Sequence, residues 1–175
     1  MKPQWEEAVK ASGVLEALAD YDPHVAGTPP LGIAIDTSDI DILCTFKDAP
    51  PFETAVQARF AHHEAFAMRR WTTGRRAVVA NFRFCGWDFE VYAEPIPVAQ
   101  QYGWRHFVVE QRLLRLGGEP IRSKVLELKT AGMKTEPAFA RALGLTGSGY
   151  DELLELADRS DESLLALLKS AGYIV

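Results

Sequence analysis

The sequence is poor in cysteine and has no long apolar run, and each shortage excludes a class of protein. Only two of its 175 residues are cysteines. Their spacing fits no zinc motif, so we expect Cys44 and Cys85 to be reduced, buried thiols. No apolar run approaches the roughly 20 residues that a membrane helix needs. The first residues also lack the apolar core of a secretory signal, so we predict a cytoplasmic protein with no membrane partner.

Positive charge is also in short supply. The 19 lysines and arginines are outnumbered by 24 acidic residues, which leaves a formal net charge of −5. Such a chain has no overall basic footprint, so we expect no strong interaction with nucleic acid, although a local basic groove is compatible with this balance. A hydrophobic content of 47% and a charged content of 25% are ordinary for a globular protein with one substantial core.

The pattern of apolar residues along the chain changes near Pro97. Before it, short helical patterns alternate with strand patterns, and after it the periodicity is helical. The expected strands are 24–26, 39–46, 66–73, 76–84 and 87–92, the last two joined as a hairpin. We therefore predict an α+β fold, with an α/β core over 1–97 and a helical C-terminal region over 98–175. In that region, a helix from Val98 is expected to close at Gly117-Gly118, and a second begins at Pro120.

Two aspartates, Asp39 and Asp41, stand one residue apart in the strand-like segment 39–46. Strand side chains alternate with period two, so both carboxylates project from the same face. Adjacent like charges repel unless a cation lies between them, which makes the pair a candidate divalent-metal clamp. The alternative is a solvated strand edge or turn.

Glu90 is the candidate for a third ligand. It is flanked by Phe89 and Val91, and an acid in such a strand lies in a cleft or beside a cation. Its strand, if next to 39–46, brings three acids together. Asp88 shares the face of Glu90 and fits the same pattern, and we favour Glu90. Hard cations such as Mg²⁺ or Mn²⁺ prefer carboxylate oxygens and keep water and phosphate as further ligands.

A Gly27-Thr28 turn precedes the acid pair. Glycine lets the backbone approach a phosphate closely, and the hydroxyl and amide groups of Thr28 and its neighbours can donate to phosphate oxygens. The following Pro29-Pro30 removes two backbone donors, which weakens this phosphate-binding inference.

This order of motifs resembles the nucleotidyltransferase superfamily typified by DNA polymerase beta. Segments 27–33, 38–44, 100–106 and 134–139, which together span most of the chain, resemble a small bacterial family of uncharacterised nucleotidyltransferase-like proteins, DUF4269. The resemblance implies a nucleotidyltransferase-like mixed or antiparallel sheet with flanking helices, followed by a C-terminal helical bundle. It implies an enzyme in which Asp39, Asp41 and Glu90 bind two metal ions.

The same resemblance implies that a nucleoside triphosphate such as ATP binds beside these acids. Gly27, Thr28 and Ser38 are then expected to contact the nucleotide. Gln101 and Arg105, four apart on the expected helix, are further candidates for touching base or phosphate; a capped helix start with a surface arginine is the equal alternative.

Four arginines, at positions 69, 70, 75 and 76, surround the Gly74 turn. A charged hairpin tip is the favoured interpretation, and steering of phosphate groups is the second.

The leading functional hypothesis is a Mg²⁺-dependent nucleotidyltransferase that moves a nucleoside monophosphate to an unknown acceptor, with a small molecule or protein favoured. The rival is a nucleotidyltransferase-fold module that binds a nucleotide or partner without catalysis. A metal-dependent phosphohydrolase that uses the same acids is a more distant third hypothesis.

Overall fold

The computed structural model describes residues 2–174, and the chain divides into two compact units. The sheet unit consists of Met1–Pro30 and Ser38–Gln101, and the helical unit consists of Leu31–Thr37 and Tyr102–Val175. Among the described residues, no helix combines the length and the apolar character that crossing a membrane requires.

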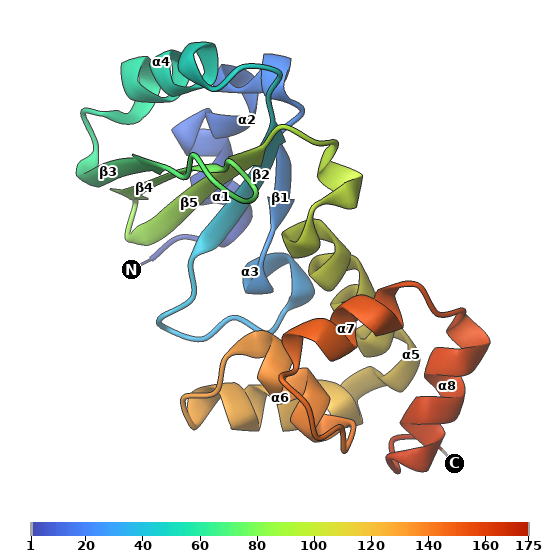
Figure 1. Ribbon diagram of the computed structural model, residues 1–175. Coiled ribbons are helices and arrows are strands. Elements are labelled where there is room, and N and C mark those ends of the chain that lie inside the picture. Colours follow the sequence, from blue (N-terminus) through green and yellow to red (C-terminus); the bar gives the residue numbers. More distant parts are fainter. Residues whose placement is uncertain (1, 175) are drawn as a thin grey trace. The chain divides into compact units, whose positions relative to one another are not determined.

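The sheet unit is built on one five-stranded sheet in the order β1-β2-β5-β4-β3 (Figure 1). The strands are β1 (His24–Ala26), β2 (Ile40–Thr45), β3 (Glu64–Arg70), β4 (Val78–Phe84) and β5 (Trp87–Glu94). β2 and β5 run parallel, and the other neighbours are antiparallel. The predicted mixed sheet is confirmed. β2 begins one residue later than expected, so Asp39 lies just before the strand.

One face of this sheet carries the core of the unit. The helices α1 (Trp5–Ser12), α2 (Val14–Ala17) and α4 (Ala49–Phe60) pack their apolar residues against alternate strand residues such as Ile40, Ile42 and Val91. Gly13 separates α1 from α2 with φ 63°, a left-handed conformation that glycine adopts at no steric cost. The opposite face therefore carries the other half of each strand, including Asp41 and Glu90.

The β4–β5 hairpin turns through Cys85 and Gly86, whose φ values are 50° and 78°. Two consecutive positive φ values are typical of the tight turns that match strand twist, so the predicted hairpin is confirmed. The expectation of two buried thiols is wrong for one of them. Cys44 is buried in β2, but Cys85 is exposed because it forms the tip of this turn.

Short elements complete the connections of the sheet unit. They are η1 (Ala19–Tyr21), α3 (Thr28–Leu31) and η2 (Val98–Gln100). The helix expected to start at Val98 is therefore wrong in its first turn. Gln101 is extended, with ψ 143°, and the long helix begins at Tyr102.

The helical unit contains α5 (Tyr102–Thr130), α6 (Thr135–Ala142), α7 (Tyr150–Ala157) and α8 (Asp161–Ser170). Gly118 divides α5 with a non-helical φ of 64° and ψ of −152°, and Pro120 follows it. This confirms the predicted stop at Gly117-Gly118 and the restart at Pro120. A side chain on Gly117 would begin 2.9 Å from Leu168, so the glycine also lets α8 approach α5 closely.

Candidate functional site

Asp41 and Glu90 face each other across the parallel pair β2–β5. They are direct register partners, and neighbouring strands lie about 5 Å apart. Both residues are half-buried, whereas their neighbours Ile40 and Phe89 are fully buried on the core face. The sheet therefore brings two of the three predicted metal ligands side by side on the face that α1, α2 and α4 do not cover.

The predicted Gly27 turn lies directly against Asp41. β1 pairs antiparallel with β2 so that Ala26 is the register partner of Asp41, and the chain turns at the next residue. Gly27 has φ 78°, and a Cβ built on it would lie 2.3 Å from Asp41 Oδ2. Glycine adopts this left-handed conformation without strain, and any side chain added here would displace the Asp41 carboxylate.

The loop after the turn is closed by a side-chain hydrogen bond. Thr28 Oγ1 donates to Ser38 Oγ at 3.0 Å, which brings together the two ends of the segment between β1 and β2. Both hydroxyls are half-buried. The structure thus gathers Gly27, Thr28, Ser38 and Asp41, four residues that the sequence separates by up to fourteen positions.

Asp39 does not complete a preformed ligand set. It is exposed and lies outside β2. Across residues 2–174, no three or more His, Cys, Asp or Glu side chains are grouped closely enough to hold a metal ion. The arrangement therefore offers two paired carboxylates. This number suits Mg²⁺, which is commonly held by one or two carboxylates while waters and substrate phosphates complete its octahedron.

Asn81 is a site residue that the sequence analysis missed. It is the β4 register partner of Glu90, and its amide donates to Glu90 Oε2 at 3.3 Å. A donor of this kind holds a carboxylate in one orientation. The hairpin register was the signal: counting back from the Cys85-Gly86 turn pairs position 81 with position 90.

Asp88, the alternative third acid, has a different partner. Arg83 binds it through two hydrogen bonds, from Nε at 2.8 Å and from Nη2 at 3.2 Å, on an exposed part of the hairpin. Asp88 is therefore already neutralised by an arginine, whereas Glu90 is the residue in register with Asp41.

A second polar cluster lies on the same sheet face, further along β5. Glu94 is 3% exposed and accepts hydrogen bonds from Tyr92 Oη at 2.6 Å and from Arg75 Nη1 at 3.3 Å. Burial raises the pKa of the Tyr92 hydroxyl above its ordinary value, and the hydrogen bond to Glu94 adds to this effect. Tyr92 therefore stays a neutral donor to Glu94, and the connection between β3 and β4 is fastened to this face by Arg75.

The structure separates Gln101 from Arg105. Gln101 is fully buried, and its amide donates to the Cys44 carbonyl at 2.8 Å and to the Ile96 carbonyl at 3.3 Å. In the helical unit, Arg105 donates to the Leu154 carbonyl at 3.1 Å and to Asp158 at 2.7 Å. The expectation that the two residues share a helix is wrong, because α5 begins at Tyr102.

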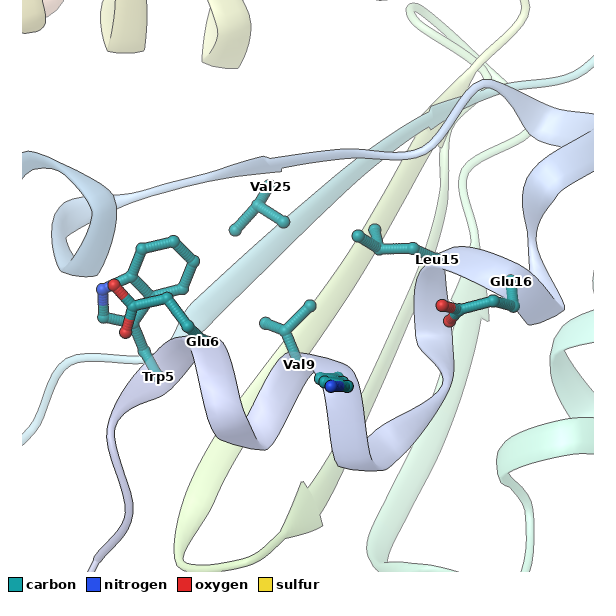
Figure 2. Close-up of a pocket in the computed structure, with 7 residues that line it drawn as sticks. Trp5, Glu6, Val9, Leu15, Glu16 and Val25 are labelled. Atoms are coloured by element: carbon teal, nitrogen blue, oxygen red, sulfur yellow. The ribbon is translucent and has the colours of Figure 1, made fainter.

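A cavity of about 250 Å³ opens elsewhere in the sheet unit, between α1, α2 and β1 (Figure 2). Trp5, Val9, Leu15 and Val25 provide most of its apolar lining. Val25 is the register partner of Ile42, so the cavity lies on the core face of the sheet and not on the face of Asp41.

Comparison with known proteins identifies both a family and a fold. The family model of a domain of unknown function, DUF4269, matches residues 7–156. No curated protein matches the sequence. Several solved structures of nucleotidyltransferases are similar to the chain at 9–16% identity.

The Cid1 poly(U) polymerase bound to MgGTP aligns with a TM-score of 0.56 and 13% identity over 86% of this chain and 47% of Cid1. The GLD-2/RNP-8 complex aligns with a TM-score of 0.59 and 9% identity over 95% of this chain and 76% of that one. Cid1 in complex with the UTP analogue UMPNPP aligns with a TM-score of 0.54 and 16% identity, over 86% of this chain and 46% of Cid1. The chain spans about half the length of Cid1, and the likeness shows the fold.

Proposed function

The chain belongs to the DUF4269 family and has a nucleotidyltransferase-like fold, and from this premise we propose that it is a Mg²⁺-dependent nucleotidyltransferase. It transfers a nucleoside monophosphate from a nucleoside triphosphate to an acceptor hydroxyl. In this reaction an acceptor oxygen forms a bond to the α-phosphorus while the α–β phosphoanhydride bond breaks. Pyrophosphate leaves with the electron pair, and the hydroxyl proton passes to solvent.

The observation that supports this proposal most directly is the pairing of Asp41 with Glu90, with the Gly27 turn packed on Asp41. Phosphoryl transfer needs little covalent chemistry from a protein, and its rate depends on positioning and charge neutralisation. Two carboxylates fixed by neighbouring strands supply oxygen ligands for a divalent cation. The turn supplies backbone that a phosphate can approach closely.

Asp39, Asp41 and Glu90 would hold the metal in this proposal. A bound Mg²⁺ neutralises phosphate charge and lowers the pKa of a coordinated hydroxyl. Asp39 lies one residue before β2, and as an exposed residue it is free to swing toward the cation when a nucleotide is present. Asn81 orients Glu90 in this set.

Gly27, Thr28 and Ser38 would contact the triphosphate. The Thr28 and Ser38 hydroxyls now bond to each other, and each can turn its proton toward a phosphate oxygen. The nucleotide contacts predicted for Gln101 and Arg105 remain predictions. For Gln101, a contact through the amide nitrogen requires exchange of its two hydrogen bonds to backbone carbonyls.

A nucleotide-binding module without catalysis is the second candidate. The observation that favours it is the exposed position of Asp39. Two carboxylates are then paired, whereas catalysis by two metal ions uses more carboxylate ligands than these two. The two candidates differ in one measurable property, because both bind nucleotide but only the enzyme releases pyrophosphate in the presence of an acceptor.

Titration calorimetry with nucleoside triphosphates, with and without Mg²⁺, tests the proposal. We expect binding to the wild type to require Mg²⁺ and to be lost in Asp41→Asn. The matched control is Asp20→Asn, which removes an exposed carboxylate of η1 in the same unit. Binding that ignores both the metal and Asp41→Asn would contradict the site. Labelled triphosphate incubated with a cell extract then separates transfer from simple hydrolysis.

A further inference from the structure

The connection between β3 and β4 concentrates positive charge around an exposed tryptophan. Four arginines lie within residues 69–76 of a chain whose net charge is −5, and Trp71 is 46% exposed. Arg70 pairs with Glu53 of α4 at 3.1 Å, and Arg75 is held by Glu94. Arg69, Trp71 and Arg76 are exposed and take part in neither of these ion pairs, and we call these three residues the arginine–tryptophan edge.

Strand register places Arg69 of this edge on the same sheet face as the paired carboxylates. Directly opposed residues on neighbouring strands share a face. One row across the sheet consists of Asp41, Glu90, Asn81 and Ala67, and the next consists of Leu43, Tyr92, Val79 and Arg69.

Trp71 extends the strand pairing beyond β3, because its backbone N–H donates to the Ala77 carbonyl at 2.8 Å. It lies two residues after Arg69 and so follows the same alternation. Arg70, between them, points to the other face, as its ion pair with α4 shows.

The separation of the two sites sets the length that a ligand touching both of them must have. β2 and β3 are three strand spacings apart, or about 14 Å, and Trp71 lies four residues beyond Ala67, which adds about 13 Å along the strand. A small-molecule acceptor at Asp41 and Glu90 does not extend this far. A polymer does.

The chemistry of the edge favours a nucleic acid as that polymer. Guanidinium groups pair with phosphates, and an exposed indole provides a flat surface for stacking an unpaired base. A duplex does not offer its base faces, so the tryptophan indicates a single strand.

We propose that the arginine–tryptophan edge binds a single-stranded polynucleotide, with Trp71 stacking on a base and Arg69 and Arg76 contacting phosphates. The terminal hydroxyl of this strand then reaches the carboxylates and is the acceptor of the transferred nucleotide, a step that rests on the proposed function. Arg75 is paired with Glu94, and this ion pair holds the segment against the sheet face that carries Asp41. The proposal revises the expected weakness of nucleic-acid binding, because the acidic total hides a local basic surface.

Fluorescence anisotropy with short labelled single-stranded oligonucleotides, RNA and DNA, tests the binding step without nucleotide or metal. We expect Trp71→Ala to weaken binding about 5- to 100-fold and Trp71→Phe to restore most of it. Arg69→Gln combined with Arg76→Gln should weaken binding and flatten its dependence on log salt by about 0.7 for each phosphate that the variant no longer neutralises. Arg59→Gln is the matched control, because Arg59 is an exposed arginine in the last turn of α4, on the other face of the sheet.

Two outcomes would overturn the proposal. One is equal affinity of the wild type, Trp71→Ala and the double arginine variant. The other is equally tight binding of an acidic peptide that competes with the oligonucleotide, which would make the edge a general anion surface. Circular dichroism of each variant checks that a loss of binding is not a loss of fold.

Asp41→Asn separates this inference from the proposed function. It should abolish transfer while leaving oligonucleotide binding unchanged. If the wild type binds oligonucleotides but transfers no nucleotide, the proposed enzymatic function is contradicted and the proposed binding at the arginine–tryptophan edge stands. If the wild type transfers nucleotide to another acceptor and binds no oligonucleotide, the proposed binding at the arginine–tryptophan edge is contradicted and the enzymatic function stands.

Discussion

The carboxylate of Asp41 lies where a side chain on Gly27 would begin, with Oδ2 2.3 Å from the position of a Cβ. Gly27 directly follows β1, and Asp41 lies in the neighbouring strand β2, where it is the register partner of Ala26. A side chain added at position 27 would therefore displace the Asp41 carboxylate.

Gly27→Ala is therefore expected to destroy the site at a modest cost in stability. The new methyl group would push Asp41 from its position. The left-handed φ of 78° adds strain on the order of 1–3 kcal/mol. We expect a lower melting temperature and a loss of Mg²⁺-dependent nucleotide binding. Gly74→Ala is the control, because Gly74 also has positive φ but has open space around it. It should lower stability and leave nucleotide binding intact.

Glu90→Gln and Asp88→Asn decide which acid is the third ligand. Glu90 is in register with Asp41, whereas Asp88 is paired with Arg83 on the surface. We expect Glu90→Gln to weaken binding of Mn²⁺, measured by electron paramagnetic resonance, at least tenfold. Asp88→Asn should change it little. The reverse order of effects would show that Asp88, two residues earlier in β5, is the metal ligand in place of Glu90.

Asn81→Ala should weaken metal binding indirectly, because Glu90 loses the donor that orients it. Removing a donor that supports a metal ligand commonly reduces metal affinity about 10- to 100-fold. Asn81→Asp places a second carboxylate beside Glu90 and should raise the pKa of the pair, shifting the pH midpoint of Mn²⁺ binding upward. Unchanged affinity and pH midpoint in both variants would show that Asn81 has no positioning role.

Gln101→Leu tests whether this buried glutamine supports the fold. Its amide links the end of β2 to the segment after β5 through two backbone carbonyls. Leaving these acceptors unpaired should cost about 1–3 kcal/mol of unfolding free energy, measured by urea denaturation. If nucleotide affinity falls at a temperature where the variant is fully folded, Gln101 also contacts the ligand.

The two cysteines should differ strongly in reactivity. Burial, with a smaller contribution from Asp22, raises the pKa of the Cys44 thiol to about 12, whereas Cys85 is exposed at the hairpin tip. Alkylation at pH 8 followed by mass spectrometry should modify Cys85 first, because the thiolate is the reactive form. Prompt modification of Cys44 in the folded protein would contradict its buried state.

The same pKa has a consequence for stability. Between the ordinary thiol pKa of 9.0 and about 12, the unfolded chain loses the Cys44 proton and the folded chain keeps it. The free energy of unfolding should therefore fall as pH rises through this window and be unaffected by Cys44 below it. Cys44→Ala removes this contribution and serves as the control.

Local patterns in the sequence predicted the elements well where each pattern depends on near neighbours. The period-two alternation of β2 and β5, the Cys85-Gly86 turn and the break at Gly118 were all visible, because turn chemistry and strand alternation are local properties. The Gly27 turn and the acid pair were visible for the same reason.

Only the tertiary structure decided which of these residues meet. The parallel register of β2 with β5 brings Asp41 opposite Glu90, and this pairing joins segments that are 49 positions apart. No local pattern specifies such a register, because it depends on how the apolar faces of both strands pack on α1, α2 and α4. The same packing selected Asn81 as the partner of Glu90, buried Gln101, and placed Trp71 and Arg69 on the face of the carboxylates.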